Sequence, residues 1–522
     1  MLDSGMAELA IEEELKRFLL VLCVSLSVAT IPRVLGWFRQ IPYTLMLVIV
    51  GTGLAWLDVR LVNLSPELIL LIFLPPLLFE AAWNSHWSYL KQQLVPISLF
   101  ASIGVVVSIL GIAIGLTQFA ALPITTALLI GACLAATDPV SVMALFKELG
   151  VGKQLATVME GESLFNDGMA IVAFSFLLEF ALGTSELALQ PVVTRLLLVV
   201  GIGLAIGLLL GFAISYLTQR FDLPLVEQSL TLISAYGAYL LAEELGGSGV
   251  IATVVTGLVL GNFGSRIGMN PRTRVLVTEF WDFLAFFVNS IVFLLIGNQI
   301  QFEDLGKNGW AIAIAVSTMI LARWGYIFSL SFISNRLANA QLTLPEQTVL
   351  WWGGLRGAVS IALALSVPTL FPDRPEIIAV VFGAVLFTLL VQGLTIKPLL
   401  SALNLLGDQP LRQRYLEAIA RRTALQRVVQ YLQQAEHRPG IETEFFEYQM
   451  SLVKGELTSI EQEIDVMDDE YPNVREFAHE QLKTELLAIE ADTYAELVQT
   501  GQLHRSLHPL LEESHSATVT LE

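Results

Sequence analysis

Stretches of about twenty apolar residues recur along this chain, and each is long enough to cross roughly 30 Å of hydrocarbon as a helix. Only 15% of the 522 residues are charged, whereas soluble proteins carry about a quarter. The apolar runs are continuous rather than alternating, which excludes a transmembrane β-barrel. The sequence therefore predicts an all-α polytopic membrane protein with about thirteen transmembrane helices. The predicted spans centre on residues 17–35, 43–57, 66–83, 94–119, 122–146, 151–180, 191–218, 225–243, 248–264, 275–300, 310–335, 345–369 and 376–403.

The charges of the connecting loops predict the orientation of these spans. Loops after odd-numbered spans are basic, and loops after even-numbered spans are mainly acidic. The basic loop residues are Arg33, Arg39, Lys91, Lys147, Lys153, Arg220, Arg266, Arg272, Arg274 and Arg336. Because loops rich in Lys and Arg stay in the cytoplasm, we expect residues 1–16 outside, 17–403 as the transmembrane domain and 404–522 in the cytoplasm. The expected location is the cell membrane.

The polar segment 404–522 is acidic, and it accounts for much of the net charge of −19, which argues against nucleic-acid binding. Ile460, Ile464 and Met467 recur at helical spacing, so we expect a mostly helical, regulatory tail. Five of the six histidines lie there, and histidine is the side chain that titrates near neutral pH. They are His437, His479, His504, His508 and His515.

Ionisable side chains inside the predicted spans indicate what the membrane domain does. Asp138, Glu162, Asp167 and Arg356 each lie within an otherwise apolar span. A charge near the bilayer centre costs about 3 kcal/mol even on lenient insertion scales, so such residues mark ion or proton pathways. Their presence predicts coupled transport of a cation and a proton.

The sequence Thr137-Asp138-Pro139 predicts a break in the fifth span. Proline lacks a backbone donor and frees carbonyl oxygens of the preceding turn. Irregular backbone in a membrane survives only where it lines a cavity or packs within protein. The freed carbonyls, the Asp138 carboxylate and the Thr137 hydroxyl together make an all-oxygen environment that suits an alkali cation.

The sixth span places four polar residues on neighbouring parts of one helix. Glu162 and Asn166 are four residues apart, as are Ser163 and Asp167, so each pair shares a helical face. Burial penalises the charged form of a carboxyl group. We therefore expect Asp167 to bind a proton or a cation in turn, which is the exchange step itself.

Arg356 needs a counter-ion, because arginine does not shed its proton. Glu162 and Arg356 each lie about eleven residues into a span that runs outward, so at 1.5 Å per residue they reach similar depth. We therefore predict a structural ion pair between them. Asp138 and Arg356 also occupy corresponding spans if the two halves are inverted repeats, which is typical of transporter sites.

Two further charges have less definite assignments. Glu80 follows a double proline near the cytoplasmic end of the third span. It either snorkels to water or lines a cytoplasmic funnel toward the ion site. Arg323 lies inside the eleventh span, and the sequence does not identify its partner.

Three ordered motifs resemble the sodium/proton antiporters of the monovalent cation:proton antiporter-1 family, the NhaP/NHE type. They are Ala-Thr-Asp-Pro-Val, Glu-Ser-Leu-Phe-Asn-Asp-Gly and Gly-Gly-Leu-Arg-Gly-Ala-Val-Ser, and the resemblance covers about residues 15–403. It implies a homodimer, two crossed and partly unwound helices, and alternating access without a cofactor. The bound species it implies are sodium, with lithium as a candidate second cation, and protons.

The same resemblance implies roles for individual residues. Asp167 would carry cation and proton, and Asp138, Ser163 and a main-chain group near Thr137 would complete the sodium site. Glu80 would lie on the approach. Asn166 would be a further ion-binding and transport residue, and its place before Asp167 is typical of electroneutral members.

Other functions use some of the same features. A potassium/proton or broad monovalent-cation exchanger would need the same residues. A cation channel would need a conduction path without a titrating carboxylate. An enzyme is not expected, because no histidine lies inside a predicted span to act as an intramembrane base or metal ligand.

Overall fold

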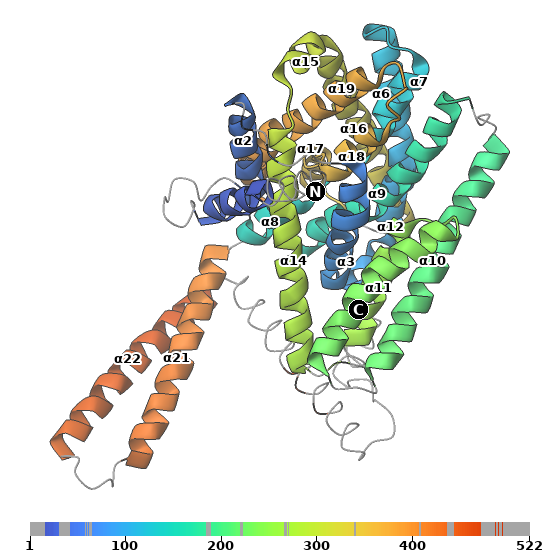
Figure 1. The fold of residues 1–522 in the computed structure, drawn as a ribbon. Coiled ribbons are helices and arrows are strands. Elements are labelled where there is room, and N and C mark those ends of the chain that lie inside the picture. Colours follow the sequence, from blue (N-terminus) through green and yellow to red (C-terminus); the bar gives the residue numbers. More distant parts are fainter. Residues whose placement is uncertain are drawn as a thin grey trace, which may run out of the picture. The chain divides into compact units, whose positions relative to one another are not determined.

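The computed structural model describes residues 16–30, 42–57, 59, 61, 65–183, 189–219, 223–265, 269, 271–338, 341–406, 409–435, 443–470, 486, 489 and 493. It divides into two compact units, residues 1–147 with 151–405 and residues 148–150 with 406–522. All regular secondary structure in the described residues is helical (Figure 1). The predicted segment 1–16 and the five tail histidines fall outside the described residues, apart from residue 16 itself.

Six described helices are long and apolar enough to cross a membrane. They comprise Leu94–Phe119, Lys153–Ala181, Thr194–Thr218, Thr273–Asn298, Gly309–Ala338 and Arg374–Ala402. Shorter apolar helices accompany them at Tyr43–Trp56, Leu68–Asn84, Ile124–Cys133 and Gly249–Gly264. Helices suit this environment because each backbone group bonds within its own segment and none is left facing lipid. The predicted all-α membrane class is confirmed.

The described elements have the following bounds. Residues 16–30 are helical. They are followed by α2 (Tyr43–Trp56), η2 (Leu68–Phe73), α3 (Leu74–Asn84), α4 (Trp87–Gln92), α5 (Leu94–Leu99), η3 (Phe100–Gly104), α6 (Val105–Phe119), α7 (Ile124–Cys133), α8 (Val140–Leu149), α9 (Lys153–Ala181), α10 (Leu189–Thr218), α11 (Pro224–Glu244) and α12 (Gly249–Val259). The remaining elements are η4 (Leu260–Gly264), α14 (Pro271–Asn298), α15 (Phe302–Lys307), α16 (Gly309–Ala338), α17 (Leu344–Trp352), α18 (Ala358–Ser366), α19 (Arg374–Phe387), η5 (Thr388–Gln392), α20 (Gly393–Ala402), α21 (Gln409–Ala435) and α22 (Thr443–Glu470).

A turn at Leu122-Pro123 separates α6 from α7. Helix α6 ends at Phe119 and Pro123 caps the start of α7. Ala121 takes a positive φ of 55° in this turn. The predicted division of residues 94–146 into two spans is therefore confirmed.

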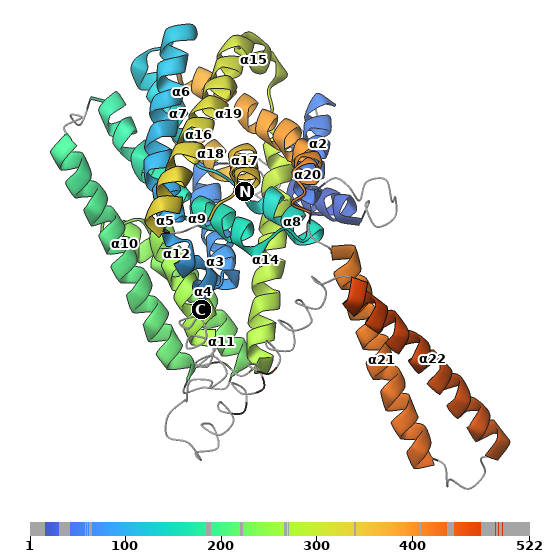
Figure 2. The same cartoon turned by 180° about the vertical axis from the view of Figure 1, so that it is seen from behind.

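Helix α10 lies along the edge of the first unit in both views (Figures 1 and 2). Of the six long apolar helices, it buries the smallest share of its apolar window. Leucines such as Leu197 and Leu209 are exposed on it. An exposed leucine surface of this kind is stable against lipid, where apolar side chains meet apolar tails.

Two of the predicted spans are interrupted near their middle. Residues 136–139 form an irregular link between α7 and α8, and residues 354–357 form one between α17 and α18. The first link contains Pro139 and the second is flanked by glycines. These interruptions occur where the two motifs place helix-breaking residues.

The second unit contains the helices α21 and α22, which run side by side as a hairpin (Figure 1). Ile460, Ile464 and Met467 on α22 pack against Tyr415 and Ala418 on α21. The amphipathic helix predicted from the spacing of these three residues is confirmed.

Candidate cation site

The link between α7 and α8 exposes backbone oxygen atoms inside the helix bundle. Pro139 cannot donate a helical hydrogen bond, so the helix stops before it. The carbonyl oxygens of Ala135 and Ala136 instead accept hydrogen bonds from Arg356 Nη1, both at 2.9 Å. A guanidinium group thus satisfies the carbonyls that the break sets free.

The link between α17 and α18 crosses the first one and bonds to it. The backbone N–H of Asp138 donates to the carbonyl oxygen of Leu355 at 2.8 Å. The backbone N–H of Arg356 donates to Thr388 Oγ1 at 3.1 Å, and Thr388 begins η5. The predicted pair of partly unwound, crossing helices is therefore present.

Gly357 allows this close crossing. A Cβ atom at this position would overlap Oδ2 of Asp138 and lie 2.7 Å from its Cγ. Any larger residue would push the Asp138 carboxylate or the backbone aside. The glycine of the third motif, Gly357, is therefore required by the aspartate of the first, Asp138.

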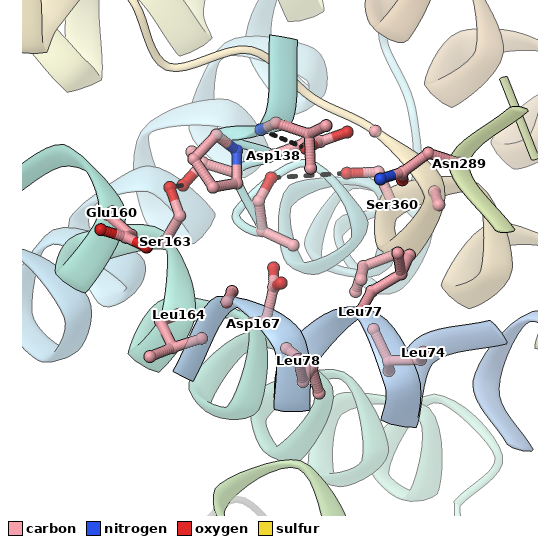
Figure 3. Close-up of a pocket in the computed structure, with 18 of the residues that line it drawn as sticks. Leu74, Leu77, Leu78, Asp138, Glu160, Ser163, Leu164, Asp167, Asn289 and Ser360 are labelled. Carbon is pink, nitrogen blue, oxygen red and sulfur yellow. Dashed lines mark hydrogen bonds between the residues drawn. The ribbon is translucent and has the colours of Figure 1, made fainter. Parts of the chain in front are cut away.

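A cavity lies beside the crossing, with carboxylates and hydroxyls on one side (Figure 3). Its polar lining residues are Thr137, Asp138, Glu160, Ser163, Asp167, Asn289 and Ser360. Its apolar wall includes Leu74, Leu77, Leu78, Ala81 and Phe293. This arrangement offers a small cation several oxygen ligands opposite an apolar wall.

Asn166 and Ser163 on α9 hold Thr137 in place. Asn166 Oδ1 accepts from the Thr137 N–H at 3.0 Å, and Asn166 Nδ2 donates to Thr137 Oγ1 at 2.8 Å. The hydroxyls of Thr137 and Ser163 are 2.9 Å apart. Asn166 was expected among the ion-binding and transport residues, and both of its polar atoms bond to Thr137, another of them.

Asp167 points into the cavity from α9 (Figure 3). The residue is 8% exposed, and its Oδ1 atom accepts no hydrogen bond from any described residue. Asp138 repels it and Arg356 attracts it. A buried carboxyl oxygen with no protein donor needs a proton, a water or a cation as its partner.

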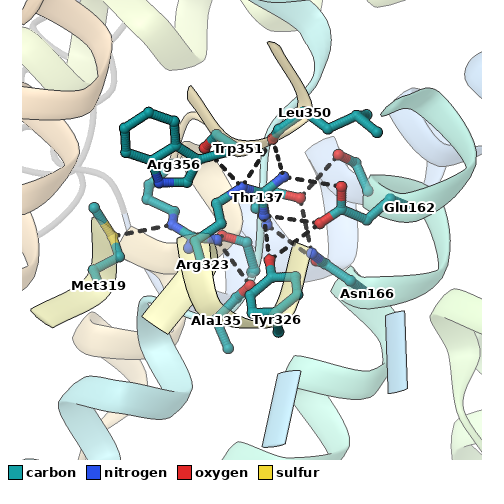
Figure 4. A network of polar contacts seen from close by, with 12 residues as sticks. Ala135, Thr137, Glu162, Asn166, Met319, Arg323, Tyr326, Leu350, Trp351 and Arg356 are labelled. Atoms are coloured by element: carbon teal, nitrogen blue, oxygen red, sulfur yellow. Dashed lines mark hydrogen bonds and ion pairs between the residues drawn. The ribbon is translucent and has the colours of Figure 1, made fainter. Parts of the chain in front are cut away.

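The predicted ion pair between Glu162 and Arg356 is wrong. Glu162 instead pairs with Arg323 of α16, whose Nη1 and Nη2 donate to Oε1 at 2.8 Å and to Oε2 at 2.9 Å (Figure 4). Arg323 Nη2 and Nε also donate to the carbonyl oxygen of Leu350, and Arg323 Nη1 donates to the Tyr326 hydroxyl. Glu162 is fully buried and Arg323 is 2% exposed.

Equal depth in the membrane did not identify the partner, because several helices reach the same depth and only lateral packing decides which side chains meet. Gly354 admits Arg323, since a Cβ atom at residue 354 would overlap the guanidinium group. The useful signal was present: Arg323 was an intramembrane cation that also needed a counter-ion.

Arg356 is stabilised by carbonyl groups rather than by Glu162. Besides Ala135 and Ala136, its Nε donates to Met319 Sδ at 3.3 Å. Its Nη2 has no hydrogen-bond partner among the described residues. Because arginine does not lose its proton in proteins, Arg356 carries a positive charge that attracts Asp167.

Glu80 does not line the cavity among the described residues, although its neighbour Ala81 does. Asn84 Nδ2 donates both to Glu80 Oε1 at 2.7 Å and to Asp282 Oδ1 at 3.0 Å. Glu160, which we did not predict, lines the cavity instead. The signal was its spacing: Glu160 lies seven residues before Asp167, two turns along the same face of α9.

The fold and this site define a class: multi-pass membrane transporters whose ion site lies where two broken helices cross. Residues 22–402 match the family model described as sodium/hydrogen exchanger, transmembrane. The Na+/H+ antiporter ApNhaP of Aphanothece halophytica is 56% identical over 98% of both chains. The low-affinity Na+/H+ antiporter NhaS1 of Synechocystis sp. is 54% identical over 98% of both chains. The chain belongs to the sodium/hydrogen exchanger family.

A solved structure has the same fold. The sodium proton antiporter MjNhaP1 from Methanocaldococcus jannaschii at pH 8 superposes with a TM-score of 0.62 at 22% sequence identity. The match covers 76% of this chain and 100% of that chain. The likeness therefore spans the whole of that antiporter.

Proposed function

We propose that this protein exchanges sodium for protons across a membrane by alternating access. Asp167 binds the cation and the proton in turn, and Asp138, Ser163 and the Thr137 main chain complete the sodium site. Asn166 positions Thr137 through two hydrogen bonds, and the Glu162–Arg323 ion pair joins α9 to α16. The relatives with at least 54% identity are named Na+/H+ antiporters, which supports the choice of ions.

One observation carries this proposal. The Asp167 carboxyl group is buried in the cavity, and its Oδ1 atom has no hydrogen-bond partner among the described residues. Its repulsion by Asp138 favours any bound positive charge. A proton or a cation at Asp167 relieves that repulsion, and the two compete because they share one carboxylate.

The proposal includes electroneutral exchange, because one carboxylate trades one proton for one monovalent cation. No cofactor takes part. Lithium is a candidate second cation. The protein acts as a homodimer in the cell membrane. Its N-terminus lies outside and residues 404–522 lie in the cytoplasm. Glu80 lines a funnel that leads from the cytoplasm to the ion site. It is a transporter rather than an enzyme.

The alternative exchangers differ in cation. A potassium/proton or broad monovalent-cation exchanger would use the same oxygen ligands, so cation dependence of the proton flux separates them. A channel would pass uncoupled current, whereas an electroneutral exchanger keeps its flux when the membrane potential is clamped to different values.

The test is sodium-dependent proton flux in proteoliposomes that contain a pH-sensitive dye. Asp167→Asn replaces the carboxyl group by a neutral isostere, so flux should be abolished while the protein still folds and inserts. Glu179→Gln is a matched control, because Glu179 lies on the same helix in an exposed ion pair with Arg195. Near-normal flux in Asp167→Asn, with normal flux in the control, would refute the proposed carrier.

A further inference from the structure

The wall of the cavity that faces the carboxylates is built by α3 and α14. Among the described residues that these two helices contribute to the lining, Asn289 alone has a polar side chain. The others are Leu74, Leu77, Leu78, Ala81 and Phe293. Figure 3 shows Asn289 beside Ser360, across the cavity from α9.

The register of α14 directs Asn289 toward the cavity. The next residue, Ser290, faces another way, because its hydroxyl lies 2.7 Å from the Tyr43 hydroxyl. Phe293, one turn further along, lines the cavity on the same face as Asn289. Helix α14 also packs against α3, where the ring centroids of Phe79 and Trp281 are 4.3 Å apart.

The amide of Asn289 is an unusual group to place in an apolar wall. It makes no hydrogen bond to any described residue. The side chain is only partly buried, and it lines the cavity, so its amide oxygen is open to whatever occupies that space. A leucine would complete the apolar wall, whereas the amide presents a polar oxygen to the cavity.

The same face of α14 continues to the acidic residues near Glu80. Asp282, which accepts a hydrogen bond from Asn84, precedes Asn289 by seven residues, or about 10 Å along the helix. Along α14, Asn289 therefore follows Asp282, which shares the Asn84 amide with Glu80, and precedes Phe293 at the cavity.

We propose that the Asn289 amide oxygen is a ligand of the transported cation, directly or through one of its waters, from the wall opposite Asp138 and Asp167. This inference rests on the proposed exchange function and adds a specificity-determining residue to it. A carbonyl oxygen is a suitable ligand for a hard cation and carries no charge, so it adds coordination without changing the charge that one cycle moves. Because it comes from the other wall, it also sets the width of the site.

The test compares Asn289→Leu, Asn289→Asp and Phe283→Leu in proteoliposomes, with the apparent KM measured for sodium and for lithium. Loss of one polar ligand should raise the KM of Asn289→Leu for sodium by about three- to tenfold. The ratio of the sodium KM to the lithium KM should change as well, because the two ions differ in size. Asn289→Asp keeps an oxygen and should retain sodium affinity. Phe283→Leu makes a similar change on an exposed part of α14 that does not line the cavity, so its KM ratio should stay that of the wild type.

Several outcomes would overturn the inference while leaving the exchange function intact. One is a wild-type protein that exchanges sodium for protons together with an Asn289→Leu variant of unchanged KM and unchanged cation ratio. Another is an equal loss in the leucine and aspartate variants accompanied by a lower melting temperature, which would make Asn289 a packing residue. A wild-type protein without sodium-dependent proton flux would instead refute the proposed function.

Discussion

The buried pair of Glu162 and Arg323 makes a sharp prediction about stability. Glu162→Gln keeps the shape of the side chain but removes its charge and leaves the Arg323 guanidinium uncompensated. Breaking a buried ion pair typically costs 3–5 kcal/mol, of the order of the energy that inserts one charged residue in a membrane. The carbonyl group of Leu350 still accepts from Arg323, so we expect about 3 kcal/mol, the lower end of that range.

The chain offers a matched control on the same helix. Glu179 also accepts two hydrogen bonds from one arginine, at 2.6 and 2.8 Å from Arg195, but both side chains are more than a third exposed. Exposed pairs contribute about 0–1 kcal/mol, so Glu179→Gln should change stability little. The two variants therefore differ mainly in the burial of the pair.

The assay is thermal unfolding of the purified protein in detergent, followed by intrinsic fluorescence. Glu162→Gln should lower the melting temperature by on the order of 5–10 °C, and Glu179→Gln by about 2 °C or less. The double variant Glu162→Gln/Arg323→Met should regain part of the loss, whereas Glu162→Gln/Arg356→Met should not. Equal shifts for Glu162→Gln and Glu179→Gln, or recovery with Arg356→Met, would refute the assigned pair.

Three other predictions concern the crossing, the pH dependence of exchange and the tail. Gly357→Ala should reduce exchange at least tenfold, because a Cβ atom at this position overlaps Asp138. Gly325 has open space around it, so Gly325→Ala should exchange normally. Sodium-dependent proton flux of both variants in proteoliposomes is the measurement, and normal flux in Gly357→Ala would contradict the crossing geometry. Competition at Asp167 should make the apparent sodium affinity fall as pH drops and the rate bell-shaped in pH, because protons block the site at low pH and are scarce at high pH. A protein ending after Asn404 should keep that bell shape in flux measurements, with at most a shifted optimum; a truncated protein that inserts normally yet has no pH dependence would place the sensor in the tail.

Much of this protein could be predicted from one-dimensional information. Span length follows from bilayer thickness, which is why runs of about twenty apolar residues predicted the membrane class. Proline lacks the helical N–H donor and glycine weakens a helix, so Pro139 and the glycines around Arg356 were signals for the two interruptions. The amphipathic helix through Ile460 and Ile464 followed from spacing alone.

Which residues carry charge in the membrane was equally evident, since Asp138, Asp167 and Arg356 stand out against apolar neighbours. Their helical spacing also placed Ser163 and Asp167 on one face of α9. These properties depend on the chain's own sequence and on the solvent around it, and both are available without a tertiary structure.

The partners of these residues were decided only by the tertiary structure. Position along the spans predicted that Glu162 and Arg356 lie at the same depth in the membrane. Lateral packing of the helices instead pairs Glu162 with Arg323, because Gly354 leaves room for the Arg323 guanidinium group. Asn289 and Glu160 carried no signal as strong as a broken helix or a motif, and they reach the cavity through the rotation of α14 and α9. Rotation and lateral neighbours come from contacts between helices distant in sequence, so the sequence determined which groups the membrane contains and the packing determined which of them meet.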